Sequence, residues 1–175
     1  MASSIFNLNA RIAAFATEVP AVVCRVKSLK ATYEENKDRI YNLAFYLTDN
    51  EMTAETVCAN VFSNVFAVNR TPSAETLDRE LVSELRQTMP IGDLTLEVPT
   101  ATETANARKN VKRAVLERAV MEVPATERLI FLMHDVEGYD HSRIARTLGI
   151  STEESRTGLH QARLAVRRAA AEIKF

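Results

Sequence analysis

The sequence contains little glycine and proline and no tryptophan: its 175 residues include four Gly, five Pro and two Cys. Such low glycine and proline contents argue against a β-rich or a disordered chain, because both depend on these residues at turns and breaks. The two cysteines, Cys24 and Cys58, lack the spacing of metal ligands and have no neighbouring Cys or His. We therefore expect two buried or idle thiols in a reducing cytoplasm.

Long apolar runs and catalytic motifs are also missing. No run reaches the ~18 residues that a membrane span needs, and the N-terminus lacks the pattern of a signal peptide. The sequence has no Gly-rich phosphate loop, HExxH motif, GxSxG motif or Cys/His cluster, so we expect no enzyme, no catalytic residue, no cofactor and no metal. The net charge of −1 means that any attraction to nucleic acid must be local.

The residues that are abundant favour helix. Alanine, leucine, arginine and glutamate are common, and apolar residues recur at steps of three and four. These patterns predict an all-α fold of two helical modules joined by a short linker. In the first module we expect one helix over 32–47, a second from Thr53 to just before Arg70, and a third that Ser73 caps.

A change of composition marks the boundary between the modules. Proline, glycine and threonine interrupt helix over 90–102, which is the expected linker. Helix resumes near Glu103, is interrupted by Pro124, and continues over 125–135. The expected organisation is an N-terminal extension at 1–29, a first module at 30–89, a linker at 90–102 and a second module at 103–175.

The N-terminal extension carries apolar residues on one helical face, because they recur at alternating steps of three and four. We expect Pro20 to end this helix, and we assign the extension no function. The apolar residues of this face are Ile5, Leu8, Ile12, Phe15 and Val19.

The C-terminal stretch predicts a helix-turn-helix. Asp140 is a plausible N-cap for a first helix, since its carboxylate can accept free amide hydrogens of the first turn. Gly149 follows this helix where a left-handed residue is needed. Ser151 and Glu154 form a capping box that starts the next helix. In this motif the second helix enters the DNA major groove, whereas the alternative is an ordinary helical hairpin with a solvated arginine face.

Motifs on both sides of this turn carry a family resemblance. Val123-Pro-Ala-Thr-Glu-Arg-Leu, Leu148-Gly-Ile-Ser151 and Leu159-His-Gln-Ala-Arg163 closely resemble region 4 of the extracytoplasmic-function (ECF) sigma factors. The first module resembles their region 2, through Tyr33-Glu34-Glu35 and Ile40-Tyr-Asn-Leu-Ala44.

This resemblance implies a subunit that binds core RNA polymerase, opens a −10 promoter element, and recognises a −35 element with the helix that starts at Ser151. An anti-sigma factor is a further implied partner. The implied DNA-binding residues are Ser151, Thr152, Glu153, Glu154, Arg156, Thr157, His160, Arg163, Arg167 and Arg168. The implied polymerase-binding residues are Glu55, Val57, Val61 and Phe62.

The sequence departs from the family pattern in both modules. Residues 30–92 hold six basic and ten acidic residues, a net charge of −4 that opposes single-stranded DNA. Residues 156–175 hold five basic residues against one acid, which suits backbone contacts with duplex DNA. Ser155 stands where an apolar residue usually packs. Gly158 stands where the family usually has Arg, so we expect Gly158→Arg to raise affinity for duplex DNA.

Three functions are compatible with these features. The first is an ECF-type sigma factor that directs polymerase to promoters. The second is a sigma-like mimic that occupies an anti-sigma factor or another protein partner, which the acidic first module favours. The third is a plain helix-turn-helix transcription regulator that uses only residues 123–172.

Overall fold

The computed structural model describes residues 3–69, 71–96 and 113–173, and for residues 3–25 it describes only the course of the backbone. The regular secondary structure in the described part of the chain is all helix, as expected, with no strand. The helices of the N-terminal module are α1 (Ser3–Thr48), α2 (Glu51–Val68) and α3 (Ala74–Leu85), and those of the C-terminal module are α4 (Arg113–Met121), α5 (Ala125–Phe131), α6 (His141–Leu148) and α7 (Thr152–Glu172).

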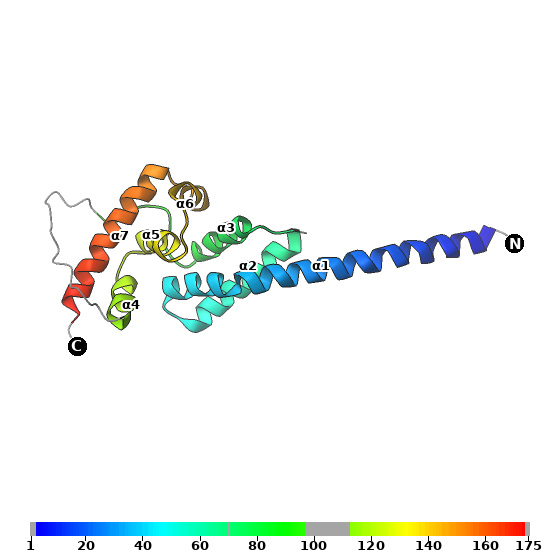
Figure 1. Cartoon of the computed structure of the whole chain (residues 1–175), viewed down its shortest axis with the longest axis horizontal. Helices are drawn as coiled ribbons and strands as arrows, with labels where there is room; N and C mark the ends of the chain where they lie inside the picture. Colours follow the sequence, from blue (N-terminus) through cyan, green and yellow to red (C-terminus); the bar gives the residue numbers. More distant parts are fainter. Residues whose placement is uncertain (1–2, 70, 97–112, 174–175) are drawn as a thin grey trace.

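Helix α1 is much longer than the expected helix over 32–47. It begins at Ser3 and continues through Pro20, so the expectation that Pro20 ends a helix was wrong. A proline removes one intrahelical hydrogen bond, and the helix-forming residues on both sides carry α1 across it. The N-terminal half of α1 extends away from the other helices (Figure 1). Residues 1–29 are therefore not separated from the first module by a break in helix.

The N-terminal module is a three-helix unit whose apolar faces meet. Helix α2 packs against both α1 and α3. The expected caps are present at α3, where Ser73 accepts a hydrogen bond from the backbone N–H of Thr76, and the side chain of Asn50 caps α2 in the same way. Fully buried side chains such as Ile40, Val61 and Leu81 form its core.

The C-terminal module places α7 across α4, α5 and α6. The expected helix over 125–135 changes form: α5 ends at Phe131, and a π-helical turn follows from Leu132 to Val136. The helix start expected near Glu103 lies outside the described residues. Buried apolar side chains, among them Leu129, Ile144 and Leu159, form the core of this module.

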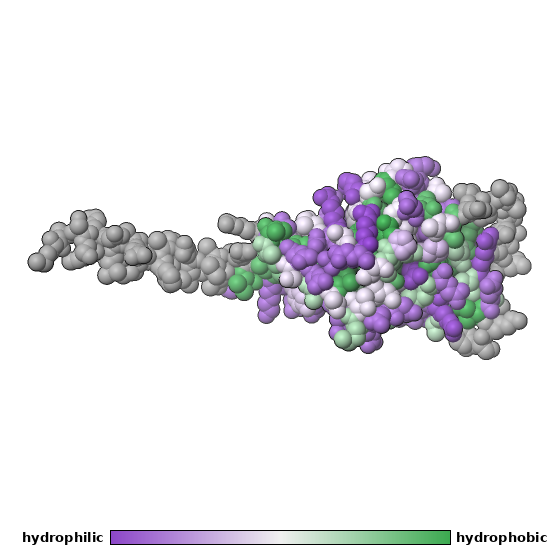
Figure 2. All heavy atoms as spheres, turned by 180° about the vertical axis from the view of Figure 1, so that it is seen from behind, coloured by the Kyte–Doolittle hydropathy of each residue, from purple (hydrophilic) through white to green (hydrophobic). Residues whose placement is uncertain are grey.

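The two modules lie against each other rather than apart. Helices α1 and α3 contact α4, α5 and α6 (Figure 1). On the face seen in Figure 2, hydrophilic side chains spread over both modules with hydrophobic groups scattered between them. Among the described residues, no helix combines the length and the apolar character that a membrane span requires.

Candidate DNA and polymerase interfaces

The helix-turn-helix is formed as its capping residues predict. The carboxylate of Asp140 accepts a 2.7 Å hydrogen bond from the backbone N–H of Arg143 at the start of α6. Gly149 ends α6 with a φ of +70°, in the left-handed region that glycine adopts without a steric penalty. These two residues fix both ends of the first helix of the motif.

The second helix, α7, starts with the expected capping box. The Ser151 hydroxyl accepts a 3.1 Å hydrogen bond from the backbone N–H of Glu154, and the Glu154 carboxylate accepts a 2.7 Å hydrogen bond from the backbone N–H of Ser151. These bonds lower the pKa of the Glu154 carboxyl. The first turn of α7 is therefore held in a fixed direction, as a helix that presents its N-terminus to DNA requires.

The inner face of α7 includes Ser155 and Gly158, two positions at which the sequence departs from the family pattern. Ser155 is fully buried, and its hydroxyl lies 3.0 Å from Nδ1 of His141. The rings of His141 and His134 stack with their centres 4.7 Å apart. Burial, followed by the neighbouring charge of His134, lowers the pKa of His141. The contact between the Ser155 hydroxyl and His141 joins α7 to α6.

Gly158 also lies on the inner face, whereas the expectation that Gly158→Arg strengthens DNA binding assumed an outward position. A Cβ atom at Gly158 would lie 2.7 Å from Cδ1 of Ile130 and 2.8 Å from Cδ2 of Leu94. Both distances are shorter than a normal carbon–carbon contact. A larger side chain at this position would therefore disturb the packing inside the module.

The outer face of α7 collects the sequence-predicted DNA-binding residues on one exposed surface. Two threonines of this set, Thr152 and Thr157, are partly exposed. The other members are exposed: Ser151, Glu153, Glu154, Arg156, His160, Arg163, Arg167 and Arg168.

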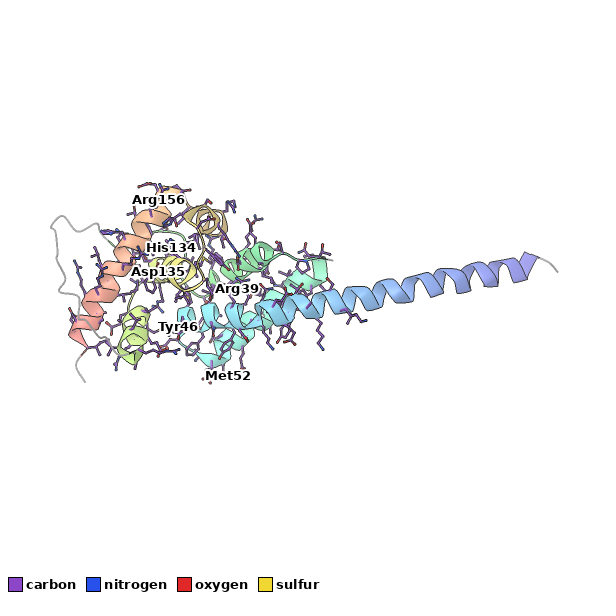
Figure 3. All side chains as sticks on the ribbon, in the orientation of Figure 1. Arg39, Tyr46, Met52, His134, Asp135 and Arg156 are labelled. Atoms are coloured by element: carbon purple, nitrogen blue, oxygen red, sulfur yellow. The ribbon has the colours of Figure 1, made fainter. Side chains whose placement is uncertain are left out.

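Two arginines of this face have acidic partners. Arg156 lies 3.2 Å from Glu153 one turn earlier. Arg163 makes a two-pronged contact with Asp135, with 2.9 Å from Nε and 2.6 Å from Nη2. This contact lowers the pKa of the Asp135 carboxyl. Figure 3 places Asp135 beside α7 and Arg156 near its N-terminal end. The positive charge offered to phosphate is therefore smaller than the arginine count suggests.

The proposed polymerase-binding residues of the first module separate into two groups. Val57, Val61 and Phe62 are buried, with 5, 0 and 5 % of their surfaces exposed, so they offer little surface to a partner, and their role in polymerase binding stays a prediction. Their spacing on α2 is that of a core stripe, which faces α1 and α3. Glu55 is exposed, and it lies on the same side of α2 as Phe62, seven residues later.

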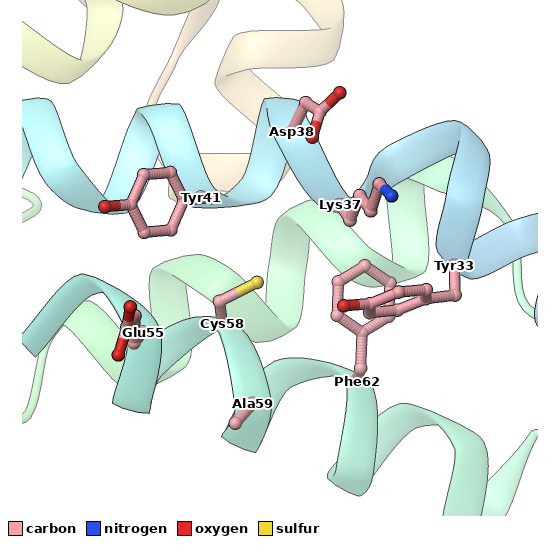
Figure 4. Close-up of a pocket in the computed structure, with 8 residues that line it drawn as sticks. All are labelled: Tyr33, Lys37, Asp38, Tyr41, Glu55, Cys58, Ala59 and Phe62. Atoms are coloured by element: carbon pink, nitrogen blue, oxygen red, sulfur yellow. The ribbon is translucent and has the colours of Figure 1, made fainter. Parts of the chain in front are cut away.

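A surface groove of about 480 Å³ runs between α1 and α2, with Glu55 and the edge of Phe62 in its wall (Figure 4). The rings of Tyr33 and Phe62 meet edge to face, with centres 4.9 Å apart. The half-buried Cys58 thiol also faces the groove, and burial raises its pKa. The complete lining consists of Tyr33, Lys37, Asp38, Tyr41, Glu55, Cys58, Ala59 and Phe62.

A charged cluster joins the two modules around the fully buried carboxylate of Asp78 on α3. Arg39 of α1 donates to Asp78 and to the Tyr139 hydroxyl. Arg143 of α6 donates to Asp78 at 2.6 Å, and its guanidinium carbon lies 3.6 Å from the centre of the Tyr139 ring. Burial, with the charge of Asp78, raises the pKa of Tyr139 to about 12. Figure 3 shows Arg39 at this junction.

Two further arginines cross the junction by binding backbone carbonyls. Arg128 of α5 donates to the carbonyl oxygens of Tyr46 and Leu47 at 3.1 and 3.4 Å, at the C-terminal end of α1. Arg86, after α3, donates to the carbonyl of Leu148 at the end of α6. Carbonyls at helix C-termini lack intrahelical donors, and these arginines supply them.

The sequence did not indicate the junction cluster. In the sequence, Asp78 and Arg39 are only two of the ten acidic and six basic residues of 30–92. The available signal was position: Asp78 lies one residue after Leu77 and three before Leu81, on the apolar face of α3, where an acid needs a buried partner.

The comparisons with known proteins agree with this architecture. The family model described as "Sigma-70, region 4" matches residues 113–166. These residues therefore resemble a sigma-70 region 4. In a solved structure, the sigma factor RpoE of Bartonella quintana, crystallised in complex with the anti-sigma factor NepR, is similar to this chain with a TM-score of 0.59 at 12 % identity. The alignment covers 85 % of this chain and 99 % of that chain.

No curated protein sequence matches the chain significantly. At 12 % identity the likeness to the sigma factor establishes a shared fold. The resemblance to region 4 is supported by the sequence over residues 113–166, and the arrangement of helices over 85 % of the chain is shared with a sigma factor.

Proposed function

We propose that the chain is an ECF-type sigma factor that binds core RNA polymerase and directs it to promoters, where α7 recognises the −35 element. One observation carries this proposal: residues 113–166 resemble a region 4, and the capped α7 presents its arginines on an exposed face. In this docking geometry the N-terminal residues of the second helix meet the base edges.

The outer face of α7 divides into two functional parts under this proposal. Arg156, near the N-terminus, is the residue best placed to reach a base edge, where arginine prefers guanine. Arg167 and Arg168 lie three turns later and supply contacts with phosphates, which fix orientation without selecting sequence. Glu153 is placed to accept a hydrogen bond from a cytosine amino group.

The groove between α1 and α2 is the docking surface for polymerase that fits best under this proposal. It offers aromatic rings from Tyr33 and Tyr41 together with the charged groups of Lys37 and Glu55. Aromatic residues beside a charged rim are typical of protein–protein interfaces. The buried residues Val57 and Val61 support this surface from beneath and do not touch the partner.

A second function has specific support, namely a mimic that occupies an anti-sigma factor. The pairing of Arg163 with Asp135 and of Arg156 with Glu153 weakens attraction to phosphate. Residues 30–92 carry a net charge of −4 from six basic and ten acidic residues. A mimic requires the sigma fold to bind the anti-sigma factor, but it does not have to bind DNA or polymerase.

Binding of purified core RNA polymerase separates these functions. We expect the intact chain to form a complex with core polymerase on size-exclusion chromatography, and Glu55→Lys to weaken it by reversing a charge in the groove. Glu35→Lys makes the same charge change on an exposed part of α1 outside the groove lining, and it should leave binding unaltered. An intact, folded chain that does not bind core polymerase would contradict the sigma-factor function and support the mimic.

A further inference from the structure

The segment between the modules is docked onto region 4 over its first six residues. We call residues 91–96 the docked linker segment. Gly92 donates its backbone N–H to the Thr126 hydroxyl at 3.1 Å. Gln161 of α7 donates to the carbonyl of Leu96. Ile91, at the start of the segment, is buried. The expected linker is therefore not free over 91–96, and 97–102 lie outside the described residues.

A buried carboxylate holds this segment. Glu127 of α5 has no exposed surface, and its Oε1 accepts hydrogen bonds from the backbone N–H groups of Thr95 at 2.6 Å and Leu96 at 2.8 Å. The Thr95 hydroxyl adds a third contact at 3.3 Å. Hydrogen bonds to an ionised carboxylate are stronger than those between neutral groups. Glu127 thus binds the backbone of the docked linker segment.

An apolar contact complements this polar one. Leu94 lies against Gly158 on the inner face of α7, where even a Cβ atom would be only 2.8 Å from its Cδ2. The absence of a side chain at Gly158 therefore makes the notch that the Leu94 side chain fills. Region 4 therefore has a binding site for the segment, which we call its seat. The Glu127 carboxylate binds the backbone, and the notch at Gly158 holds the Leu94 side chain.

The docked state limits how far the modules can move apart. While residues 91–96 remain on region 4, only residues 86–90 connect the two modules. Five residues span at most ~17 Å. Modules of this size have radii of gyration of about 10 Å, and therefore outer radii of about 14 Å. With the ~17 Å connection between them, their centres can separate to only ~45 Å. If the segment leaves its seat, the 22 residues between Pro90 and Arg113 add up to ~75 Å of chain.

Promoter recognition requires a larger distance between the two modules than is possible while residues 91–96 stay bound to region 4. This step rests on the proposed function, since the −10 and −35 elements lie about 25 base pairs, or ~85 Å, apart along B-DNA. A region 2 and a region 4 whose centres stay within ~45 Å cannot occupy both elements. Chain released from the seat supplies enough length for both.

We propose that residues 91–96 and their seat on region 4 form a releasable latch that sets the reach between the two modules. The occupant of the seat is this chain's own segment. While the latch is closed, residues 86–90 are the only connection and keep the modules close together even when their junction opens. Release of Leu94 and of the Thr95 and Leu96 amides converts the sigma factor to the extended form.

Distance measurements on the intact chain test the latch without polymerase or DNA. Spin labels at Met52→Cys on α2 and Leu116→Cys on α4, both exposed, report the separation of the modules in a Cys24→Ser/Cys58→Ser background. Four versions are compared: the parent, Asp78→Ala, Glu127→Gln, and the double variant. Asp78→Ala opens the junction, and Glu127→Gln weakens the latch.

We expect the parent to give one short distance, Asp78→Ala a broader distribution with a sharp upper limit, and the double variant distances that exceed this limit by tens of Å. If Asp78→Ala alone reaches the distances of the double variant, the latch does not restrain the modules and the proposal is overturned. The same conclusion follows if the double variant never exceeds the limit of Asp78→Ala.

Hydrogen exchange gives a second readout that does not depend on opening of the junction. Glu127→Gln should speed exchange of the Thr95 and Leu96 amides by about tenfold or more. Leu94→Ser, which leaves the helices of region 4 unchanged, should do the same. The matched control is Glu122→Gln, at an exposed glutamate in the turn before α5. Unchanged exchange in both latch variants would contradict the latch, whereas loss of polymerase binding bears only on the proposed function.

Discussion

The Asp78 carboxylate of the N-terminal module accepts a 2.6 Å hydrogen bond from Nη2 of Arg143, which belongs to the helix-turn-helix. The side chain of Asp78 has no exposed surface, whereas that of Arg143 is 29 % exposed. The pair therefore joins the core of one module to the edge of the other. A buried carboxylate of this kind is tolerated only while its partners remain.

Removing this carboxylate should loosen the junction. Asp78→Ala leaves Arg39 and Arg143 without their shared partner, and we expect the free energy of unfolding to fall by ~3 kcal/mol, as for other broken buried ion pairs. Chemical denaturation measures this change. The control is Glu75→Ala, which removes the exposed ion pairs of Glu75 with Arg79 and Arg146 and should have a much smaller effect. If both variants lower the free energy of unfolding equally, the Asp78 cluster does not contribute more to holding the modules together than an exposed ion pair does.

Substitution of Gly158 should destabilise region 4. Gly158→Arg forces its side chain against Ile130 and Leu94, and overpacking of this kind costs ~1–3 kcal/mol. Thermal unfolding followed by circular dichroism should show a lower midpoint. Leu94→Ala in the same chain makes room on one side and should restore part of the loss. A Gly158→Arg variant with unchanged stability and higher DNA affinity would mean that this position faces solvent.

Removal of Asp135 should strengthen binding to duplex DNA. Asp135→Ala releases Arg163 from its two-pronged contact and also deletes a negative charge beside α7. If Arg163 then reaches a phosphate, the logarithm of affinity should depend more steeply on the logarithm of salt concentration, by a slope of about 0.9. Fluorescence anisotropy across a salt series measures both effects. Glu35→Ala, which deletes an equal charge on α1, should change neither the affinity nor the slope.

Stability should fall at high pH because of Tyr139. Its folded-state pKa is raised to about 12 from an ordinary value of 10.0, so above pH 10 the unfolded chain releases this proton while the folded chain retains it. The contribution of Tyr139 is therefore complete below pH 10 and is lost as the pH rises toward 12. Tyr139→Phe should remove this part of the alkaline loss relative to the parent. A parallel decline of parent and variant between pH 10 and 12 would argue against the shift.

The helices and their caps could be predicted from the sequence because both depend on local chemistry. Asp140, Gly149 and Ser151 act within a few residues of their positions, so their spacing was sufficient to predict the helix-turn-helix. The course of α1 through Pro20 was not predicted, because the tolerance of one missing hydrogen bond depends on the helix around it.

The candidate site was predictable only in part. The exposed face of α7 was found because arginines and a helix start are visible in sequence. The role of Gly158 was missed because its neighbour Leu94 is 64 residues away along the chain, and the same is true of Asp78 and Arg143, which are 65 residues apart. The buried side of α2 was also readable, because Val57 and Val61 have the spacing of a core stripe.

Transcription in a purified system tests the central claim most directly. Core RNA polymerase, with and without the chain, is supplied with a library of templates that carry randomised −35 and −10 elements, and the transcripts are sequenced. If the chain is a sigma factor, it should produce transcripts that share a −35 sequence, and Arg156→Ala should alter or relax the preference at one or two −35 positions, at a cost of ~1–3 kcal/mol for the best base. A folded chain that binds core polymerase but yields no chain-dependent transcripts, or transcripts whose −35 sequence is unaffected by substitutions on α7, would contradict the claim.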